Sequence, residues 1–260
     1  MTVVEFKDVF VKYETYTGGV LALRGVTFSL GESEAILIMG PSGSGKTTIL
    51  KAILGLVQPI HGTVKVFGLE PKDEKRALAI RRRIGYLTQE GRMINELTVW
   101  ENIIFYAKGR GRSLNESLVR ELAEELNIKT ILDKHPDQLS GGELKRAELL
   151  MVLSDDPGLL LLDEPTSMLD AENSEAVVNV LSALKGRVPM IITSHDPRLQ
   201  KITNKTLEII GGELKGARGG TASSSRGERV PVRRDESLHR PGNQKALNGL
   251  YFSNTAFWWE

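Results

Sequence analysis

The stretch Gly40-Pro41-Ser42-Gly43-Ser44-Gly45-Lys46-Thr47-Thr48 decides the fold. It follows an apolar run, Ala35 to Met39, that predicts a buried strand, and it opens a helical pattern from Lys46 to about Gly55. A glycine-rich loop between a strand and a helix can turn successive backbone N–H groups into one concavity, to which the helix N-terminus adds positive potential. The stretch therefore predicts a phosphate-binding loop, and the context disfavours the alternative of a glycine-rich turn that only caps a helix.

The side chains at the end of this loop each have an expected task. The ammonium of Lys46 supplies a point charge for the β- and γ-phosphates of a nucleotide. The hydroxyl of Thr47 is a ligand for Mg²⁺, and Thr48 is placed to help hold the α-phosphate side. The loop indicates the class of ligand and leaves the function open, because kinases, GTPases, helicases and transport ATPases all contain such loops.

A second acidic element follows the apolar run Leu159 to Leu162. Asp163 and Glu164 are adjacent carboxylates at the end of an expected strand, where alternation of side chains can give them different tasks. We expect Asp163 to hold Mg²⁺, often through water, and Glu164 to orient or deprotonate the attacking water. Alone, the pair would indicate a solvated strand end; downstream of a phosphate loop it predicts catalysis.

Short apolar runs alternate with helical patterns over most of the chain, which is typical of an α/β fold. Expected strands lie at 26–30, 35–39, around Val64 and Val66 at a sheet edge, at 84–88, 159–162 and 189–193, and in a hairpin that closes over Gly211-Gly212. Expected helices lie at 73–83, 98–108 after a Thr cap, 116–127, 141–153 after Ser140, and 171–185. Because no strand pattern falls between 98 and 153, we expect an all-helical subdomain at about 90–153.

Composition excludes several classes of function. The 260 residues carry a formal net charge of +1, which gives no electrostatic attraction to nucleic acid, so we expect no nucleic-acid partner. The chain has no cysteine, which rules out disulfides and thiolate chemistry. Its longest apolar runs are far shorter than the roughly 18 residues that span a bilayer. We therefore expect a cytoplasmic protein without a membrane span.

The composition changes from about Gly216 onward, where Gly, Ser, Arg and Pro follow one another without periodicity. Such a segment buries too little apolar surface to offset its ordering entropy. The sequence predicts a globular domain at 1–215 and a disordered tail at 216–260, either a flexible extension or a cloning or frameshift extension. A peptide anchor through Trp258 and Trp259 is the less favoured alternative.

The stretch Leu139-Ser140-Gly141-Gly142-Glu143 opens the helical pattern before the acidic strand and resembles the ABC signature motif. Physically it is a second helix N-terminus with two glycines and a hydroxyl, which suits an anion. The resemblance to ABC-type ATPases implies a P-loop NTPase core with a mixed or parallel sheet and a small antiparallel β subdomain near the N-terminus. It also implies that two subunits meet head to tail, with Ser140, Gly141 and Gly142 reaching the γ-phosphate held by the other chain.

Further residues follow in the order of the same family. Gln89 resembles the glutamine that contacts Mg²⁺ or the lytic water; taken singly it would be a surface residue. The loop that ends at Asp170 resembles one whose aspartate crosses the dimer interface. His195 resembles the switch histidine that touches the γ-phosphate, although a lone histidine at a strand end is usually structural. Tyr13 resembles the aromatic residue that stacks on adenine, with Tyr16 as the competing candidate.

The resemblance covers residues 3 to 215 and implies an ATP-hydrolysing transport subunit. In such proteins MgATP closes a dimer, of identical or paralogous subunits, and hydrolysis opens it. The expected partner is a membrane permease that contacts the helical lobe near 89–100 and holds the subunit at the inner face of the cell membrane. A soluble ABC ATPase that acts on a protein complex is the alternative, and a small-molecule kinase is remote. Three residues depart from the usual pattern of the signature helix: Glu143, Glu148 and Met151.

Overall fold

Parallel strands with apolar side chains on both faces form the core of the protein. The computed structural model describes residues 1–15, 18–89, 91 and 93–219. Strands β5 (Ile84–Leu87), β6 (Leu159–Asp163), β7 (Met190–Thr193), β3 (Ala35–Met39), β8 (Lys205–Ile210) and β9 (Glu213–Gly219) lie side by side in that order. All pairs are parallel except β8 with β9. Every residue of β6 and β7 is buried, which explains why their sequences are continuous apolar runs instead of alternating ones.

A separate antiparallel sheet contains β2 (Gly18–Gly31), β1 (Thr2–Thr15) and β4 (His61–Val66) in that order. It confirms the small antiparallel element and the edge position of the strand with Val64 and Val66. The expected strand at 26–30 is only the second half of β2. Strand β1 was not predicted, because register shifts interrupt its alternation and Asp8 has a φ of 49°.

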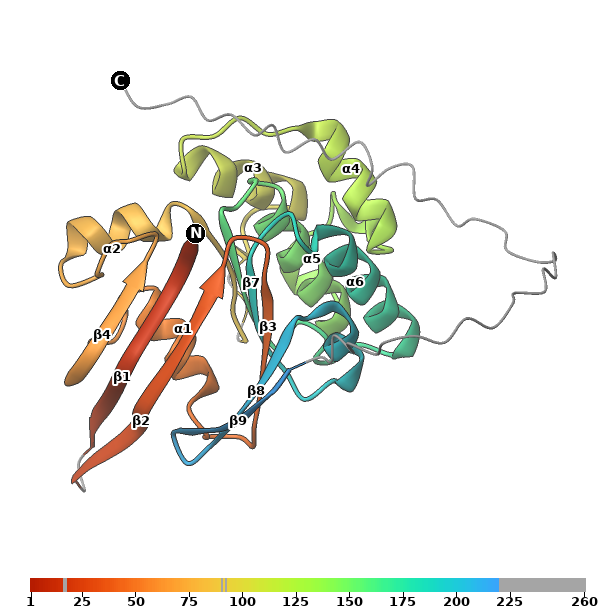
Figure 1. Ribbon diagram of the computed structural model, residues 1–260. Helices are drawn as coiled ribbons and strands as arrows, with labels where there is room; N and C mark the ends of the chain where they lie inside the picture. The colour runs from red at the N-terminus through yellow and green to blue at the C-terminus, as the bar shows by residue number, and fades with distance from the viewer. Residues whose placement is uncertain (16–17, 90, 92, 220–260) are drawn as a thin grey trace, which may run out of the picture. The chain divides into compact units, whose positions relative to one another are not determined.

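Helices make up the region between β5 and β6. Among the described residues of that region there are α3 (Val99–Gly109), α4 (Glu116–Glu125) and α5 (Gly141–Leu153), short 3₁₀ turns at η1 (Lys129–Ile131) and η2 (Pro136–Gln138), and no strand. Figure 1 shows α3, α4 and α5 grouped on one side of the β3–β7 sheet. The remaining helices are α1 (Lys46–Ile53), α2 (Glu74–Arg81), α6 (Ala171–Leu184) and η3 (Pro197–Ile202). The α/β class and the helical insertion are thereby confirmed.

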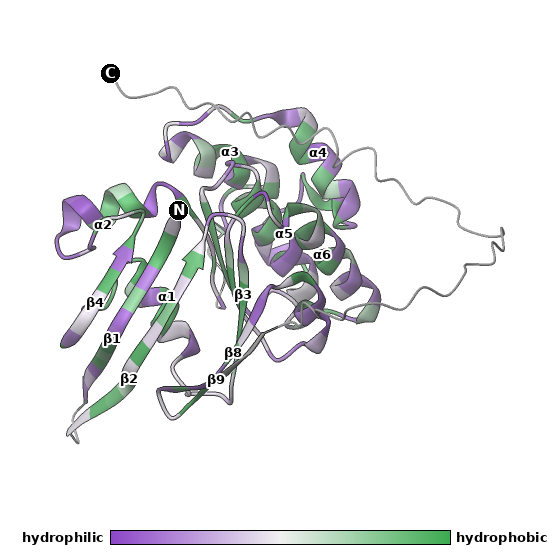
Figure 2. Ribbon diagram, in the orientation of Figure 1, coloured by the Kyte–Doolittle hydropathy of each residue, from purple (hydrophilic) through white to green (hydrophobic). Residues whose placement is uncertain are grey.

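Hydropathy follows this arrangement. In Figure 2 β3 is green over its length, whereas α2 carries purple, hydrophilic turns. No helix in the described part of the chain is long and apolar enough to cross a bilayer. Strand β9 continues to Gly219, so it takes up the first four residues that the sequence assigns to the tail. Residues 220–260, with Trp258 and Trp259, lie outside the described residues, as does Tyr16.

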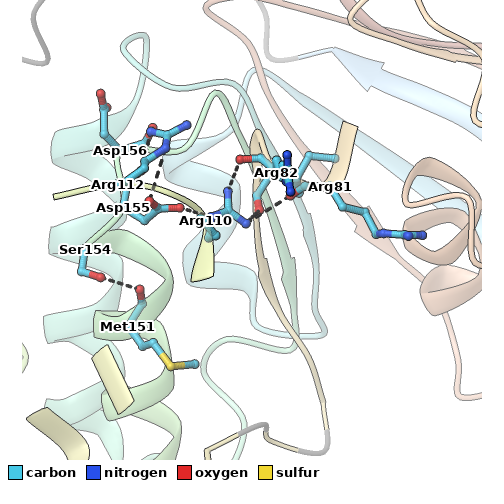
Figure 3. Close-up of polar contacts among 9 residues, drawn as sticks. Arg81, Arg82, Arg110, Arg112, Met151, Ser154, Asp155 and Asp156 are labelled. Carbon is cyan, nitrogen blue, oxygen red and sulfur yellow. Dashed lines mark hydrogen bonds and ion pairs between the residues drawn. The ribbon is translucent and has the colours of Figure 1, made fainter. Parts of the chain in front are cut away.

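Arg110 ties the helical region to the core (Figure 3). It caps the C-terminus of α3 and donates to the backbone oxygens of Arg81 and Ile84, at 3.1 and 3.0 Å, and to that of Arg82 at 2.6 Å. Its Nε also pairs with the carboxylate of Asp155, which is fully buried just after α5. Burial raises the pKa of Asp155, and the charge of Arg110 opposes that rise. One guanidinium therefore joins α2, α3, β5 and the end of α5.

Replacing Arg110 with Met should lower the free energy of unfolding by about 2 to 3 kcal/mol, because it leaves a buried carboxylate with one guanidinium instead of two. Breaking a buried ion pair usually costs about 3 to 5 kcal/mol. The loss here should lie at or below the lower end of that range, because the guanidinium of Arg112 remains 3.4 Å from the Asp155 carboxylate. Arg120→Met is the matched control: this exposed arginine lies over the ring of Trp100, and its loss should cost about 1 kcal/mol or less. Equal losses for the two variants in urea unfolding would contradict the structural role of Arg110.

Candidate active site

A cavity of about 750 Å³ lies at the carboxyl ends of β3, β6 and β7. In open α/β sheets such ends are the usual place for a ligand. The cavity brings together most of the residues singled out in the sequence: Tyr13, Ser42, Gly43, Gly45, Lys46, Thr47, Thr48, Gln89, Asp163, Glu164 and His195 line it. Segments far apart in the chain therefore meet at one site.

The phosphate loop needs glycine at two positions for steric reasons. Gly45 has a φ of 108°, and a Cβ there would lie 2.6 Å from the backbone oxygen of Ala22. A Cβ on Gly40 would collide with the backbone oxygen of Ile209. The side chain of Lys46 folds back across the loop, and its Nζ donates to the oxygens of Gly40 and Pro41 at 2.7 and 3.1 Å. A lysine ammonium thus stands over a concave backbone, an arrangement suited to phosphate.

Asp163 is held by two hydroxyls. It is 1% exposed, and its Oδ2 accepts a hydrogen bond of 2.8 Å from Thr47 Oγ1 while its Oδ1 accepts one from Thr193 Oγ1. Carboxylate and hydroxyl oxygens are the hard donors that Mg²⁺ prefers, usually one or two from the protein with water and phosphate completing the shell. Thr47, Asp163 and the nearby Gln89 therefore fit a magnesium ion at this end of the cavity.

Glu164 turns away from Asp163 through a strained backbone. Its φ is 51°, a left-handed conformation that is unfavourable for a non-glycine residue. Three hydrogen bonds hold this turn: Glu164 N donates to Thr193 O at 2.9 Å, and the N and Oγ of Ser167 donate to Glu164 O at 3.2 and 2.8 Å. The carboxylate Oε1 lies 3.6 Å from His195 Nε2, which is itself 3.3 Å from Lys46 Nζ. A carboxylate, an imidazole and an ammonium thus converge next to the phosphate loop.

At the other end of the cavity, Tyr13 stands with residues of the β1–β2 hairpin. Val20, Leu21, Ala22 and Arg24 line this part together with Gly211 and Gly212 of the β8–β9 turn. Backbone hydrogen bonds join these pieces, from Gly212 N to Ser44 O at 3.0 Å and from Arg24 N to Gly212 O at 2.8 Å. The aromatic ring of Tyr13 and the apolar side chains of Val20, Leu21 and Ala22 beside the phosphate loop are suited to an aromatic base.

Known proteins are similar to this chain in sequence. Residues 23–167 match the ABC transporter family. The chain belongs to the ABC transporter family. It is 36% identical over 200 residues to the phosphonates import ATP-binding protein PhnC 1 of Rhodopseudomonas palustris, covering 70% of this chain and 72% of that protein. It is 34% identical over 201 residues to the lipoprotein-releasing system ATP-binding protein LolD of Aquifex aeolicus, covering 75% and 89%.

Solved structures agree with the sequence comparison. A dimeric structure of the ATP-binding cassette MJ0796 in a post-hydrolysis state, bound to ADP and Pi, matches with a TM-score of 0.75 at 29% identity. The match covers 83% of this chain and 98% of that one. The expectation of an ABC ATPase that binds nucleotide is confirmed.

The signature residues do not line the cavity of their own chain. Ser140 is the N-cap of α5, and a Cβ on Gly141 or Gly142 would lie 3.2 to 3.3 Å from atoms of Met168 and Leu169. Asp170 follows that loop as the N-cap of α6, with its Oδ1 accepting from Asn173 N at 2.8 Å. The signature motif and the loop that ends at Asp170 therefore pack against each other; Ser167 and Met168 of that loop line the cavity, whereas Asp170 does not.

Glu143 forms a capping box with Ser140, in which the glutamate supplies a negative charge that the usual glutamine would lack. Its carboxylate accepts from the hydroxyl and the backbone N of Ser140, at 2.7 and 2.9 Å, and Ser140 Oγ accepts from Glu143 N at 3.3 Å. The hydroxyl bond and then the backbone bond hold the pKa of Glu143 below its ordinary value. The negative charge also suits the first turn of a helix.

Sequence reasoning missed two residues that organise the site. Thr193 is the last residue of β7 and follows an ordinary apolar run, so the sequence does not mark it as functional. Only the pairing of β7 with β6 brings its hydroxyl to Asp163. Lys145 lies in α5, where a lysine normally indicates a solvated helix face, yet it is 5% exposed and burial lowers its pKa. The sequence signal that could have identified Lys145 is its position between the apolar residues Leu144 and Ala147 of the same helix.

Replacing Glu143 with Gln should remove a pH-dependent part of the stability. The folded-state pKa of Glu143 is depressed, so its contribution is complete above the ordinary carboxyl value of 4.5 and is lost as the pH falls through the lower folded value. Because the side chain is partly exposed, the effect should be less than about 1 kcal/mol. Urea unfolding of wild type and variant between neutral and acidic pH measures it, with Glu116→Gln in the first turn of α4 as control. A difference that grows as the pH falls would contradict the cap.

Proposed function

We propose that this subunit binds MgATP in the cavity at the ends of β3, β6 and β7, hydrolyses it between two copies or paralogues, and drives a membrane permease. The observation that carries the proposal is the convergence of Lys46, Glu164 and His195 beside a phosphate loop, with Nζ and Nε2 3.3 Å apart and Nε2 and Oε1 3.6 Å apart. Phosphoryl transfer depends on positioning of the reacting groups and on charge stabilisation, and little on covalent chemistry by the protein. This cluster of side chains supplies the positioning and the charge.

Each residue has a role in this proposal. The loop from Gly40 to Thr48 cradles the phosphates, with Lys46 on the β- and γ-phosphates and Tyr13 against the adenine. Glu164 accepts a proton from, or orients, the water that attacks in line, and His195 contacts the γ-phosphate. Thr47, Asp163 and Gln89 hold the magnesium ion, which when bound neutralises charge on the β- and γ-phosphates.

The second half of the site comes from another subunit. Ser140, Gly141 and Gly142 form a helix N-terminus that does not line the chain's own cavity, which suits a γ-phosphate held by a partner. Asp170 lies next to the same interface. The solved cassette MJ0796 is dimeric, which supports this arrangement. Because the shared γ-phosphate is lost on hydrolysis, ATP favours the closed dimer more than ADP does, and this difference in affinity can move a partner.

This subunit has a groove that suits the docking of a permease. A cavity of about 450 Å³ lies between the helical region and the core, lined by Leu54, Leu56, Arg81, Ile84, Tyr86, Ile94, Asn102, Phe105, Tyr106, Gly109, Arg110 and Met151. Phe105 is 60% exposed and Leu56 49%, so two large apolar side chains of this groove are open to a partner. Ile94 belongs to the segment 89–100 that we expect to meet the permease. An apolar segment of the permease on this groove would hold the subunit at the inner face of the cell membrane.

Glu164→Gln tests the catalytic assignment. Glutamine has the same size and shape as glutamate but cannot act as a base. Turnover should therefore fall by about 100-fold or more, while ATP binding persists. It should accumulate an ATP-bound dimer, visible by size-exclusion chromatography with multi-angle light scattering. Lys46→Ala should instead lose nucleotide affinity, because the phosphates lose their main side-chain partner.

Glu172→Gln in the first turn of α6 serves as the matched control for Glu164→Gln, and its turnover should equal that of wild type. Normal hydrolysis by Glu164→Gln would refute the base. Loss of ATP binding in both Glu164→Gln and Lys46→Ala would show that the two residues do not have separate tasks.

Phe105→Glu tests the permease. A charge in the groove should abolish co-purification of a stoichiometric polytopic membrane protein from detergent-solubilised membranes, identified by mass spectrometry, while basal ATP hydrolysis stays at the wild-type rate. Leu78→Glu is the control, because Leu78 is 43% exposed on α2 and does not line the groove. Capture of soluble proteins alone by the wild type would favour the assembly-factor alternative.

A further inference from the structure

Lys145 places a cation beneath the active site. It lies in α5, about one and a half turns after Ser140. Its Nζ donates to the backbone oxygen of Thr88 at 2.7 Å and lies 3.5 Å from the backbone oxygen of Asp163. Thr88 directly precedes Gln89, and Asp163 directly precedes Glu164. One ammonium group therefore contacts the backbone carbonyls directly before Gln89 and Glu164, the two residues whose side chains are proposed to contact the attacking water.

The same helix also contacts the chain on the other side of Gln89. Glu148 is 4% exposed, and a Cβ added to Gly91 would collide with its Oε1. Gly91 has a φ of 77°, so glycine suits both the backbone conformation and the close approach of the carboxylate. The helix thus meets the segment around Gln89 from both ends, through Lys145 at Thr88 and through Glu148 at Gly91.

Packing alone does not account for a lysine here. The α5 positions Ala147, Leu149 and Leu150 are fully buried and apolar, whereas Arg146 and Glu148 are buried charged residues like Lys145. A charge removed from water is unfavourable unless it meets polar partners in good geometry. The hydrogen-bond partners of Lys145 are two carbonyls, one directly after β5 and one at the end of β6, which are paired neighbours in the sheet, and Glu148 and Glu164 supply opposite charge nearby. The contact links these two strand ends through one ammonium.

We propose that Lys145 is a positioning residue for ATP hydrolysis: it fixes the ends of β5 and β6 so that Gln89 and Glu164 meet the attacking water in the correct geometry. This inference rests on the proposed roles of Gln89 and Glu164. Because Ser140 and Lys145 belong to one helix, the signature motif and these strand ends move as one body. A phosphate that draws Ser140 into the interface also sets the position of the hydrolytic residues.

Three variants of the full chain test the proposal. Lys145→Met removes the ammonium and keeps a long side chain, so kcat should fall by about tenfold or more, since misplacement of reacting groups by about 1 Å can cost up to about 100-fold. The dissociation constant for ATP, measured with a fluorescent ATP analogue, should stay within about threefold of wild type, because Lys145 does not line the cavity. Lys145→Gln keeps one donor that reaches one carbonyl, so its kcat should lie between those of Lys145→Met and wild type. Lys108→Met, an exposed lysine of α3, should behave as wild type.

The outcomes separate this inference from the function on which it rests. Wild-type kcat in Lys145→Met, or equal loss of kcat and ATP affinity, would overturn the positioning role. If Lys145→Met does not fold, Lys145→Gln decides: a kcat equal to wild type overturns the proposal, and a reduced kcat at unchanged ATP affinity supports it. Absence of hydrolysis in the wild type, or normal hydrolysis in Glu164→Gln, would refute the proposed function instead.

Discussion

The parallel pairing of β6, β7 and β3 is the constraint on which the site depends. Asp163 pairs with Thr193 in the register of β6 and β7, and Thr193 pairs with Ile38 in the register of β7 and β3. Since side chains alternate along a strand, a slip of one residue would send the Asp163 carboxylate to the opposite face. The phosphate loop leaves β3 directly after this layer. The register of three buried strands therefore decides that Thr47, Asp163 and Thr193 share hydrogen bonds.

Two adjacent carboxylates can have different tasks because the backbone separates them. Like charges in close contact disfavour each other's ionisation, so neighbouring acids need distinct partners. Asp163 remains in the strand, buried between the hydroxyls of Thr47 and Thr193. Glu164 begins a left-handed turn and points to His195. The unfavourable φ of Glu164 is compensated by the three hydrogen bonds that hold the turn, and the strain is located where the chemistry needs a defined side-chain direction.

The parts of the fold that depend on local sequence were predictable. Helix α5 spans the expected residues 141–153, and its start follows from Ser140 as a cap. The buried strands β3 and β6 follow from continuous apolar runs that only a doubly covered sheet accommodates. The residues around the phosphate loop and after β6 were likewise identifiable, because each stands at the end of such a run.

The remaining features depend on contacts between distant segments. The strand β1 escaped prediction because its bulges break the period of two. The partnership of Arg110 with Asp155 joins residues that sequence patterns treat as ordinary surface charges, yet Asp155 is fully buried. Thr193 and Lys145 have no motif of their own, and their positions follow from which strands lie side by side. Propensity and periodicity describe one segment at a time, so they do not reveal these neighbours.

One chain holds two halves of different sites. Its cavity contains a phosphate loop, a candidate metal-binding pair and a candidate base, whereas Ser140, Gly141 and Gly142 at the N-terminus of α5 do not line that cavity. The capping box with Glu143 satisfies the backbone N–H groups of Ser140 and Glu143, so the glycines between them provide the N–H groups left for an anion. Because only some of its N–H groups are capped by the chain itself, this helix end can still bind an anion from outside. In the proposed function this asymmetry links pairing of subunits to ligand binding, because a second α5 would close over each nucleotide.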